Sequence, residues 1–176
     1  MDGQPAPTPA RSVESYLAAI ESLARELIRT GEFELTVAVR KASAPEEDFE
    51  APEYVVDFAG PDADLLLEKN AALLNALEYV VLKAVRLEED LFGKITFDCQ
   101  DWRRLRAEEL KLMAEVAAQR VVETGDSFTL NPMSPRERRI IHLALREQAQ
   151  VRTVSEGLGA ERKVVIHPAA PPPRRR

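Results

Sequence analysis

Apolar positions in the first third of the chain follow first a helical and then a strand period. They recur every three or four residues over 12–30, which predicts a helix, and Gly31 stands where that helix would end. Apolar and polar residues then alternate over 33–39 and again over 54–58, on either side of an acidic loop that contains proline. The pattern predicts a helix followed by a two-stranded hairpin.

A further helical region follows the hairpin and begins near Gly60. The buried stripe of its long helix is expected to comprise Leu73, Leu77, Val80, Val81 and Val85. A short strand is predicted at 95–97. Helix, strand, strand, helix, helix and strand in this order describe a three-stranded sheet with helices on one face.

The apolar pattern starts again near residue 100 and predicts a second unit. A long helix is expected over 101–123, with Gly125 at its end. Its packing side is predicted to comprise Leu112, Met113, Val116, Ala117 and Val121. Strand candidates surround a helix over 134–150, and they lie at 128–130, 151–154 and 163–166. A compact α+β unit is expected.

The start of the 134–150 helix carries a capping signature. Ser134 can cap the helix through its hydroxyl, Pro135 suits the first helical position, and Glu137 completes a Ser-x-x-Glu capping box. Free N–H groups at such a start, together with the helix dipole, attract anions. We therefore expect a helix start that can bind phosphate.

Arg138 and His142 lie four residues apart and share one face of this helix. An arginine fork can grip phosphate while a histidine donates a hydrogen bond or stacks. Arg136 and Arg139 add fixed positive charge within the first two turns. Taken alone, the pair also fits another interpretation, in which His142 is a half-buried helix residue with one satisfied nitrogen.

Charge is unevenly distributed along the 176 residues, whose net charge is −6. Residues 1–98 hold 9 Lys or Arg and 20 Asp or Glu, a net charge of −11. Residues 99–176 hold 15 Lys or Arg and 10 Asp or Glu, a net charge of +5. Only the second half has the positive net charge that is typical of nucleic-acid-binding domains.

Several functional classes find no support in the sequence. Cys99 is the single cysteine, so neither an intramolecular disulfide nor a multi-cysteine zinc site can form. Acidic clusters at 46–50 and 88–90 are interpreted as solvated charge runs. Without metal-ligand spacing, a phosphate loop or a Ser/His/Asp order, we expect neither a cofactor nor catalysis. The lack of a signal peptide or a membrane-spanning apolar run predicts a cytoplasmic protein without membrane insertion.

The second unit resembles the R-three-H domain, a small fold that binds single-stranded nucleic acid and is named for its Arg-x-x-x-His motif. Segments similar to the Jag family, also called the SpoIIIJ-associated protein family, occur in the same order: TG at 124–125, NPM at 131–133, ERRIIH at 137–142, VSEG at 154–157 and VVI at 164–166. LLNALEY at 73–79 resembles part of the KH domain that precedes R-three-H in that family. The resemblance covers residues 13–168.

Composition at the two ends and the resemblance between them predict four segments. A disordered lead at 1–11 and a Pro- and Arg-rich tail at 169–176 would flank a KH-like domain at 12–99 and an R-three-H domain at 100–168. The expected fold class is α+β, with a KH-like three-stranded sheet that has helices on one face, followed by a small α+β R-three-H domain. Because only about a dozen residues precede the first predicted helix, we expect the family's separate N-terminal domain to be absent from this sequence.

One departure from the family concerns the KH loop. KH domains clamp about four nucleotides with a Gly-x-x-Gly loop, whose glycines let backbone N–H groups approach phosphates. The corresponding tetrad here is Glu68, Lys69, Asn70 and Ala71. Both glycines are absent, and a carboxylate stands where phosphate would lie. We therefore expect the KH-like domain to bind nucleic acid weakly or not at all and to serve in packing or protein contacts.

The resemblance implies a bacterial post-transcriptional regulator, linked to cell elongation and division, that binds single-stranded RNA or single-stranded DNA. It also implies a KH-domain protein as partner, or a homodimer through the KH half. The expected nucleic-acid-binding residues are Arg138, His142, Arg139, Arg136 and Arg104. Arg104, with Arg103 and Arg106, equally fits a solvated helix face, and Trp102 can stack a base or anchor a domain junction. The alternative function is a protein-interaction adaptor, whose acidic half recruits a partner and whose R-three-H half is structural.

Overall fold

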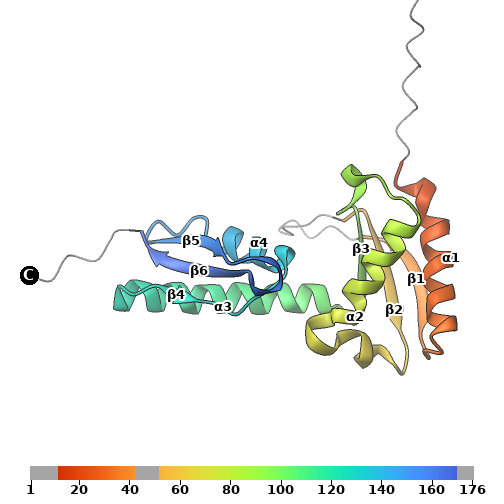
Figure 1. The fold of residues 1–176 in the computed structure, drawn as a ribbon, viewed down its shortest axis with the longest axis horizontal. Helices are drawn as coiled ribbons and strands as arrows, with labels where there is room; N and C mark the ends of the chain where they lie inside the picture. Colours follow the sequence, from red (N-terminus) through yellow and green to blue (C-terminus); the bar gives the residue numbers. More distant parts are fainter. Residues whose placement is uncertain (1–11, 43–51, 170–176) are drawn as a thin grey trace, which may run out of the picture. The chain divides into compact units, whose positions relative to one another are not determined.

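The computed structural model describes residues 12–42 and 52–169 (Figure 1). The chain divides into two compact units, Met1–Trp102 and Arg103–Arg176. The predicted lead at 1–11, most of the predicted tail and the centre of the acidic loop lie outside the described residues. Within the described ranges, no helix combines the length and the apolar character needed to cross a membrane.

The first unit contains two long helices and a three-stranded sheet. Its elements are α1 (Glu14–Thr30), β1 (Thr36–Lys41), β2 (Tyr54–Ala59), α2 (Ala63–Ala84), the 3-10 helix η1 (Glu89–Leu91) and β3 (Ile95–Cys99). β2 lies in the centre of the sheet, antiparallel to β1 and parallel to β3. Because parallel strands need a long crossover connection, α2 lies between β2 and β3 in the sequence.

One face of this sheet shares an apolar core with both helices. The strand register places Phe58 opposite Val37 on one side and opposite Cys99 on the other, so the three side chains lie on one face. Ile20 of α1 and Leu74 of α2 are fully buried in the same core. This arrangement confirms the predicted sheet with helices on one face.

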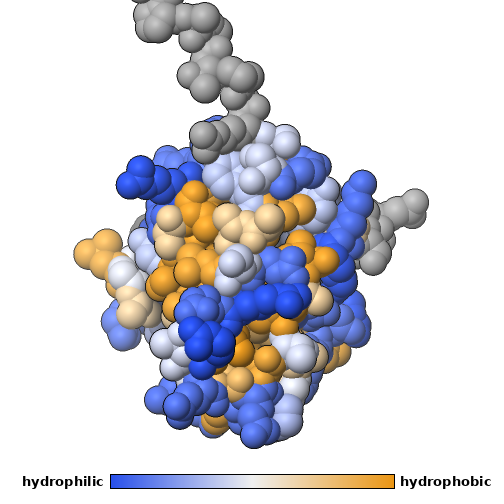
Figure 2. Space-filling model, turned by 90° about the vertical axis from the view of Figure 1, so that its right-hand side faces the viewer, coloured by the Kyte–Doolittle hydropathy of each residue, from blue (hydrophilic) through white to orange (hydrophobic). Residues whose placement is uncertain are grey.

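On the side that carries α1, hydrophilic side chains cross the apolar patches of the surface (Figure 2).

The second unit contains two helices and a small antiparallel sheet. Its elements are α3 (Trp102–Thr124), β4 (Phe128–Thr129), α4 (Pro135–Ala144), β5 (Val151–Glu156), the 3-10 helix η2 (Gly159–Glu161) and β6 (Lys163–Pro168). β6 lies between β4 and β5, so β5 is an edge strand. Leu110 of α3, Ile141 of α4 and Ile166 of β6 are fully buried in one core. The α+β class predicted from the sequence is confirmed.

The helix predicted over 134–150 is shorter in the structure. α4 ends at Ala144, and the N–H of Leu145 closes its last turn on the Ile141 carbonyl (3.2 Å). Residues 146–150 are all exposed, so burial does not stabilise further helical turns. The chain turns instead and enters β5.

Three apolar residues that were predicted to be buried are exposed. Val80 of α2 is 50% exposed, and Leu112 and Val116 of α3 are 62% and 63% exposed. A helix turns by about 100° per residue and buries one stripe against its neighbours. In α3 that stripe runs through Ala114 and Ala118, which are completely buried. Leu112 and Val116 lie on the opposite side of the helix.

Candidate nucleic-acid interface

The start of α4 forms the predicted capping box. The hydroxyl of Ser134 accepts a hydrogen bond from the Glu137 N–H (3.2 Å), and the Ser134 N–H donates to the Glu137 carboxylate (2.9 Å). The Arg138 N–H donates to the Ser134 carbonyl. Pro135 has no N–H, and those of Glu137 and Arg138 are occupied. The helix start therefore offers fewer backbone donors than the sequence suggested, and an anion must be bound mainly by side chains.

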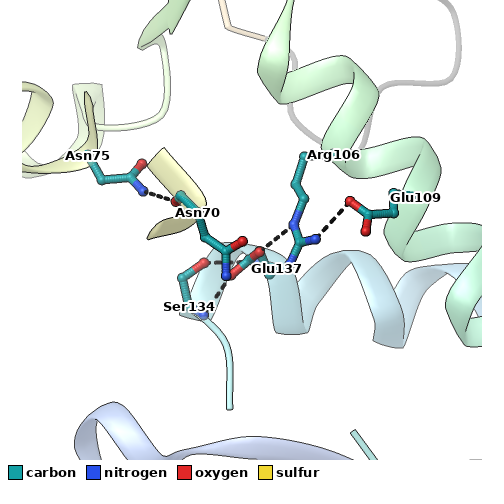
Figure 3. A network of polar contacts seen from close by, with 6 residues as sticks. All are labelled: Asn70, Asn75, Arg106, Glu109, Ser134 and Glu137. Carbon is teal, nitrogen blue, oxygen red and sulfur yellow. Dashed lines mark hydrogen bonds and ion pairs between the residues drawn. The ribbon is translucent and has the colours of Figure 1, made fainter. Parts of the chain in front are cut away.

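Arg106 of α3 holds α4 through the same glutamate. Its guanidinium donates to Glu137 from Nε (2.8 Å) and to Glu109 from Nη1 (2.8 Å), as Figure 3 shows. The side chains of Arg106 and Glu137 are only 18% and 11% exposed, whereas that of Glu109 is 65% exposed. Glu137 thus caps α4 and attaches it to α3. The sequence pattern revealed the cap but not this ion pair, whose members are 31 positions apart.

Arg138 and His142 share one flank of α4, and both are half-buried. The Nε of Arg138 is buried and has no hydrogen-bond partner among the described residues. Both ring nitrogens of His142 contact β5, with Nδ1 2.6 Å from the Thr153 hydroxyl and Nε2 2.8 Å from the Ser155 hydroxyl. A hydroxyl can donate or accept, so these two contacts suit either tautomer of the ring.

His142 is held in its neutral form by its surroundings. Burial lowers the pKa of His142, and the neighbouring Arg138 charge lowers it further. The ring therefore ties the edge strand β5 to α4 in the free protein. A phosphate beside His142 would raise the pKa of the ring, because a negative charge favours the protonated form. Thr153 and Ser155 belong to this site. Ser155 lies in the VSEG segment at 154–157, but nothing in the sequence paired either hydroxyl with His142.

We expect His142 to make the second unit less stable in mild acid. The unfolded chain binds a proton near the ordinary histidine pKa of about 6.5, whereas the folded chain, with its lowered pKa, binds it only at lower pH. The stability that His142 contributes is therefore complete above about pH 6.5 and is lost as the pH falls below it. The urea midpoint should fall between pH 7.5 and pH 5.5 in the wild type and fall less in His142→Gln.

A direct NMR titration provides the decisive control for this pH effect. Arg138→Gln removes the neighbouring charge but leaves the burial, so the pKa of His142 should rise part of the way towards its ordinary value. A wild-type pKa of His142 at or above about 6.5 would contradict the environment described here.

The other predicted arginines do not converge on this pair. Successive helical residues are about 100° apart, so Arg136 lies about 200° from Arg138 on α4. Arg139 is exposed. Arg104 forms an ion pair within α3 and lies about 200° from Arg106, the arginine that reaches α4. These side chains can add charge to the surrounding surface but cannot all contact the same phosphate.

Trp102, Cys99 and His167 have structural surroundings. Trp102 is half-buried and packs against the core of the first unit. Burial, followed by nearby carboxylates, raises the pKa of the Cys99 thiol to about 11, so the thiol is unreactive at neutral pH. The Nδ1 of His167 lies 2.7 Å from the Ser127 hydroxyl. Over the described ranges, no group of three His, Cys, Asp or Glu side chains could hold a metal ion.

A tight turn interrupts α2 at the predicted KH tetrad. Lys69, Asn70 and Ala71 have φ values of 50°, 59° and 54°, whereas Glu68 is extended with φ −56° and ψ 151°. The side chain of Asn75 donates to the Asn70 carbonyl at 3.4 Å (Figure 3). The left-handed region is unfavourable for residues that carry a Cβ atom. The chain therefore forms a turn that favours glycine at a place where it has none.

Known proteins show similarity to both units. The R-three-H domain family matches residues 108–168. RNA-binding protein KhpB of Clostridium symbiosum is 35% identical over 114 residues, which cover 65% of this chain and 51% of the relative. For RNA-binding protein KhpB of Bacillus subtilis the identity is 37% over 109 residues, 61% of this chain and 52% of the relative. For RNA-binding protein KhpB of Lactiplantibacillus plantarum it is 29% over 159 residues, 90% of this chain and 45% of the relative.

These similarities confirm the resemblance found in the sequence. The R-three-H match covers α4, which carries Arg138 and His142, and β5, which carries the two hydroxyl partners of His142. The relatives bear the name of a binding protein, in agreement with the expectation that the chain is not an enzyme. The chain spans about half the length of these relatives. The KH-like interpretation of the first unit stays a prediction.

Proposed function

We propose, on the premise that this chain is an R-three-H-domain protein of the Jag type, that it binds single-stranded RNA through α4 and β5. Both elements lie within the R-three-H match. The similar proteins from three bacteria are named RNA-binding proteins. The net charge of +5 on residues 99–176 also suits a polyanionic ligand.

The observation that carries this proposal is the unpartnered Nε of Arg138 beside His142. Buried polar groups in proteins almost always have partners, and an anion or a water molecule can supply the one that this donor lacks. Arg138 is half-buried, and a side chain already restrained by packing loses less entropy on binding than a free surface arginine. Its guanidinium can then bind a phosphate through parallel N–H donors.

His142 and its two hydroxyl partners complete the phosphate contact. A phosphate oxygen can replace either the Thr153 or the Ser155 hydroxyl at the ring, and the released hydroxyl can itself donate to the phosphate. The phosphate charge favours protonation of His142, which strengthens the contact. Phosphate contacts of this kind fix the strand in place without reading its sequence.

RNA affinity is expected to fall steeply with salt. Each phosphate contact on a single strand contributes about −0.7 to the slope of log affinity against log salt. Three cationic contacts therefore predict about 20-fold weaker binding at 200 mM than at 50 mM salt. Fluorescence anisotropy of a labelled single-stranded RNA pool measures the slope. An affinity that is flat across this range would contradict binding through arginines.

The tetrad in α2 is proposed not to clamp an RNA backbone. Glu68 is exposed and carries negative charge, and the first half of the chain has a net charge of −11. The methyl group of Ala71 is fully buried, so this residue helps to pack the core although its φ favours glycine. The two departures from Gly-x-x-Gly thus have different physical consequences, repulsion at one end and packing at the other.

Substitutions at the two ends of the tetrad test this proposal. Glu68→Gln removes the charge without changing the turn, because φ −56° suits any residue, and should raise RNA affinity a few-fold. Glu68→Gly with Ala71→Gly should raise it further if missing backbone access also matters. Unchanged affinity in both variants would show that the surface around the turn is unsuited to RNA as well.

The resemblance to the Jag family also supports finer proposals. The protein would act in the bacterial cytoplasm as a post-transcriptional regulator linked to cell elongation and division. Its first unit would contact a KH-domain protein or a second copy of this chain. Analytical ultracentrifugation of the purified chain distinguishes a homodimer from a monomer that awaits a partner.

One observation favours a protein-interaction adaptor that binds its partner through α3 of the second unit, and not through the acidic half as the sequence suggested. Leu105, Leu112 and Val116 are 52%, 62% and 63% exposed and lie on one side of α3. Exposed apolar side chains that line up on a helix can bind a partner. Binding through such a surface depends less on salt than binding of RNA through arginines.

A further inference from the structure

The outer side of α2 carries an exposed aromatic ring. Tyr79 is 63% exposed, and every other Phe, Tyr or Trp side chain in the described part of the chain is buried or half-buried. Ala72, Ala76 and Lys83 are also exposed, and their spacing places them on the same side of the helix. We call these four residues the Tyr79 stripe.

The Tyr79 stripe lacks acidic side chains although its unit is strongly acidic. Residues 72–84 contain one acid, Glu78. Its carboxylate accepts hydrogen bonds from the Phe97 N–H (2.8 Å) and the Thr96 hydroxyl (3.4 Å) of β3, so it faces the sheet. Within residues 72–84, α2 therefore places no carboxylate on the side of the Tyr79 stripe.

Lys83 is placed beside aromatic rings and not beside a carboxylate. Its Nζ lies 5.9 Å from the centre of the Tyr79 ring and 4.7 Å from that of Phe92. Lys83 forms no ion pair within the described residues. An exposed ring with an unpaired amine close to it can hold a nucleotide, since the ring stacks on a base while the amine attracts a phosphate.

We propose that the Tyr79 stripe is a stacking site for one base of single-stranded RNA, with Lys83 in contact with an adjoining phosphate. The inference rests on the proposed function, because it takes RNA as the ligand. It assigns the contact to residues of the first unit outside the KH tetrad, and so departs from the expectation that this unit binds nucleic acid weakly or not at all. Tyr79 lies about 12 Å along the helix from Ala71, since each residue adds about 1.5 Å.

The size of the surface favours a base over a protein partner. A stable protein interface takes about 20–30 residues from each side. Tyr79 is the one large ring in the stripe, and its other members are two alanines and one lysine; next to the stripe, Val80 is also exposed. Such a surface is small for a protein but is sufficient for a single planar base.

Photocrosslinking of the full chain locates the contact. A single-stranded RNA 12-mer containing 4-thiouridine is bound at low salt, irradiated and digested with trypsin, which releases residues 70–83 as one peptide. Mass spectrometry is expected to find crosslinked RNA on this peptide, and Tyr79→Ala should remove it. Tyr79→Ala should also weaken binding about 5-fold or more, while Tyr79→Phe keeps the ring and the affinity.

Two matched controls separate stacking from other effects. Val80→Ala shortens the neighbouring exposed side chain and should leave RNA affinity within about 2-fold, because it removes no stacking ring. An oligonucleotide of the same length with abasic sugars should bind the wild type and Tyr79→Ala equally, since it has phosphates but no bases. Circular dichroism checks that both variants are folded.

The outcomes distinguish this inference from the proposed function. Crosslinks confined to the second unit, with equal affinities for the wild type and Tyr79→Ala, would overturn the stacking site and leave α4 and β5 as the RNA surface. Affinity that depends on Tyr79 but not on Arg138 and His142 would support the stacking site and overturn the proposed one. If Tyr79→Ala changes the oligomeric state and not the RNA affinity, the stripe is a protein contact and the inference is wrong.

Discussion

RNA binding is expected to weaken about 100-fold when Arg138 and His142 are both replaced by alanine. A hydrogen bond between charged groups contributes about 1.5–3 kcal/mol, and this variant removes the guanidinium contact together with the ring beside it. A combined loss of about 3 kcal/mol corresponds to about 100-fold in Kd. Anisotropy with a labelled single-stranded RNA at 50 mM salt measures the effect.

The control for this experiment is another arginine near α4. Arg146 follows the helix, is exposed and forms an ion pair with Glu147. Arg146→Ala therefore removes one positive charge but leaves Arg138 and His142 unchanged. Its affinity should stay within about 3-fold of the wild type, because exposed charges act weakly. Arg138→Lys keeps the charge but lacks the planar fork, and an intermediate loss is expected. If the double variant is folded and binds RNA as tightly as the wild type, α4 has only a structural role.

Glu137→Ala is expected to destabilise the second unit by about 3 kcal/mol. Loss of this carboxylate removes the capping box, which contributes about 1 kcal/mol, and leaves the nearly buried Arg106 without its more buried partner. Removing one member of a buried ion pair costs about 3–5 kcal/mol. We expect less than the sum because Arg106 keeps Glu109. Urea unfolding followed by circular dichroism measures the change.

Glu109→Ala is the matched control, because it removes a carboxylate from the same arginine. The Glu109 side chain is 65% exposed, so its loss should change the free energy of unfolding by about 0.5 kcal/mol at most. Glu137→Gln keeps hydrogen-bonding capacity without the charge and should fall between the two variants. Equal effects of Glu137→Ala and Glu109→Ala would show that the burial of Glu137 does not matter.

Local signals in the sequence predicted most of the secondary structure. The capping box at Ser134 formed as expected, because its members lie within one turn of each other. The strands that alternate apolar and polar residues also paired, and β2 took the centre of the first sheet. Such features depend on residues that are close together in the chain, so they can be recognised in the sequence.

Predictions that depended on burial were less successful. Leu112 and Val116 fit an apolar stripe on α3 as well as Ala114 and Ala118 do, but the structure buries the alanines. Small side chains allow a neighbouring element to approach closely, and periodicity alone cannot tell which of two apolar sides will be covered. The end of α4 was misplaced for a related reason, since residues 146–150 have no neighbour to pack against.

The sequence by itself determined the order of helices and strands, the uneven charge and the common flank of Arg138 and His142. The last of these follows from a spacing of four residues in a capped helix. Only the tertiary structure showed that Thr153 and Ser155 occupy both nitrogens of His142 and that Arg106 reaches Glu137. Periodicity and caps are set within one or two turns of the chain, whereas hydrogen-bond partners and burial are set by whichever distant element packs alongside.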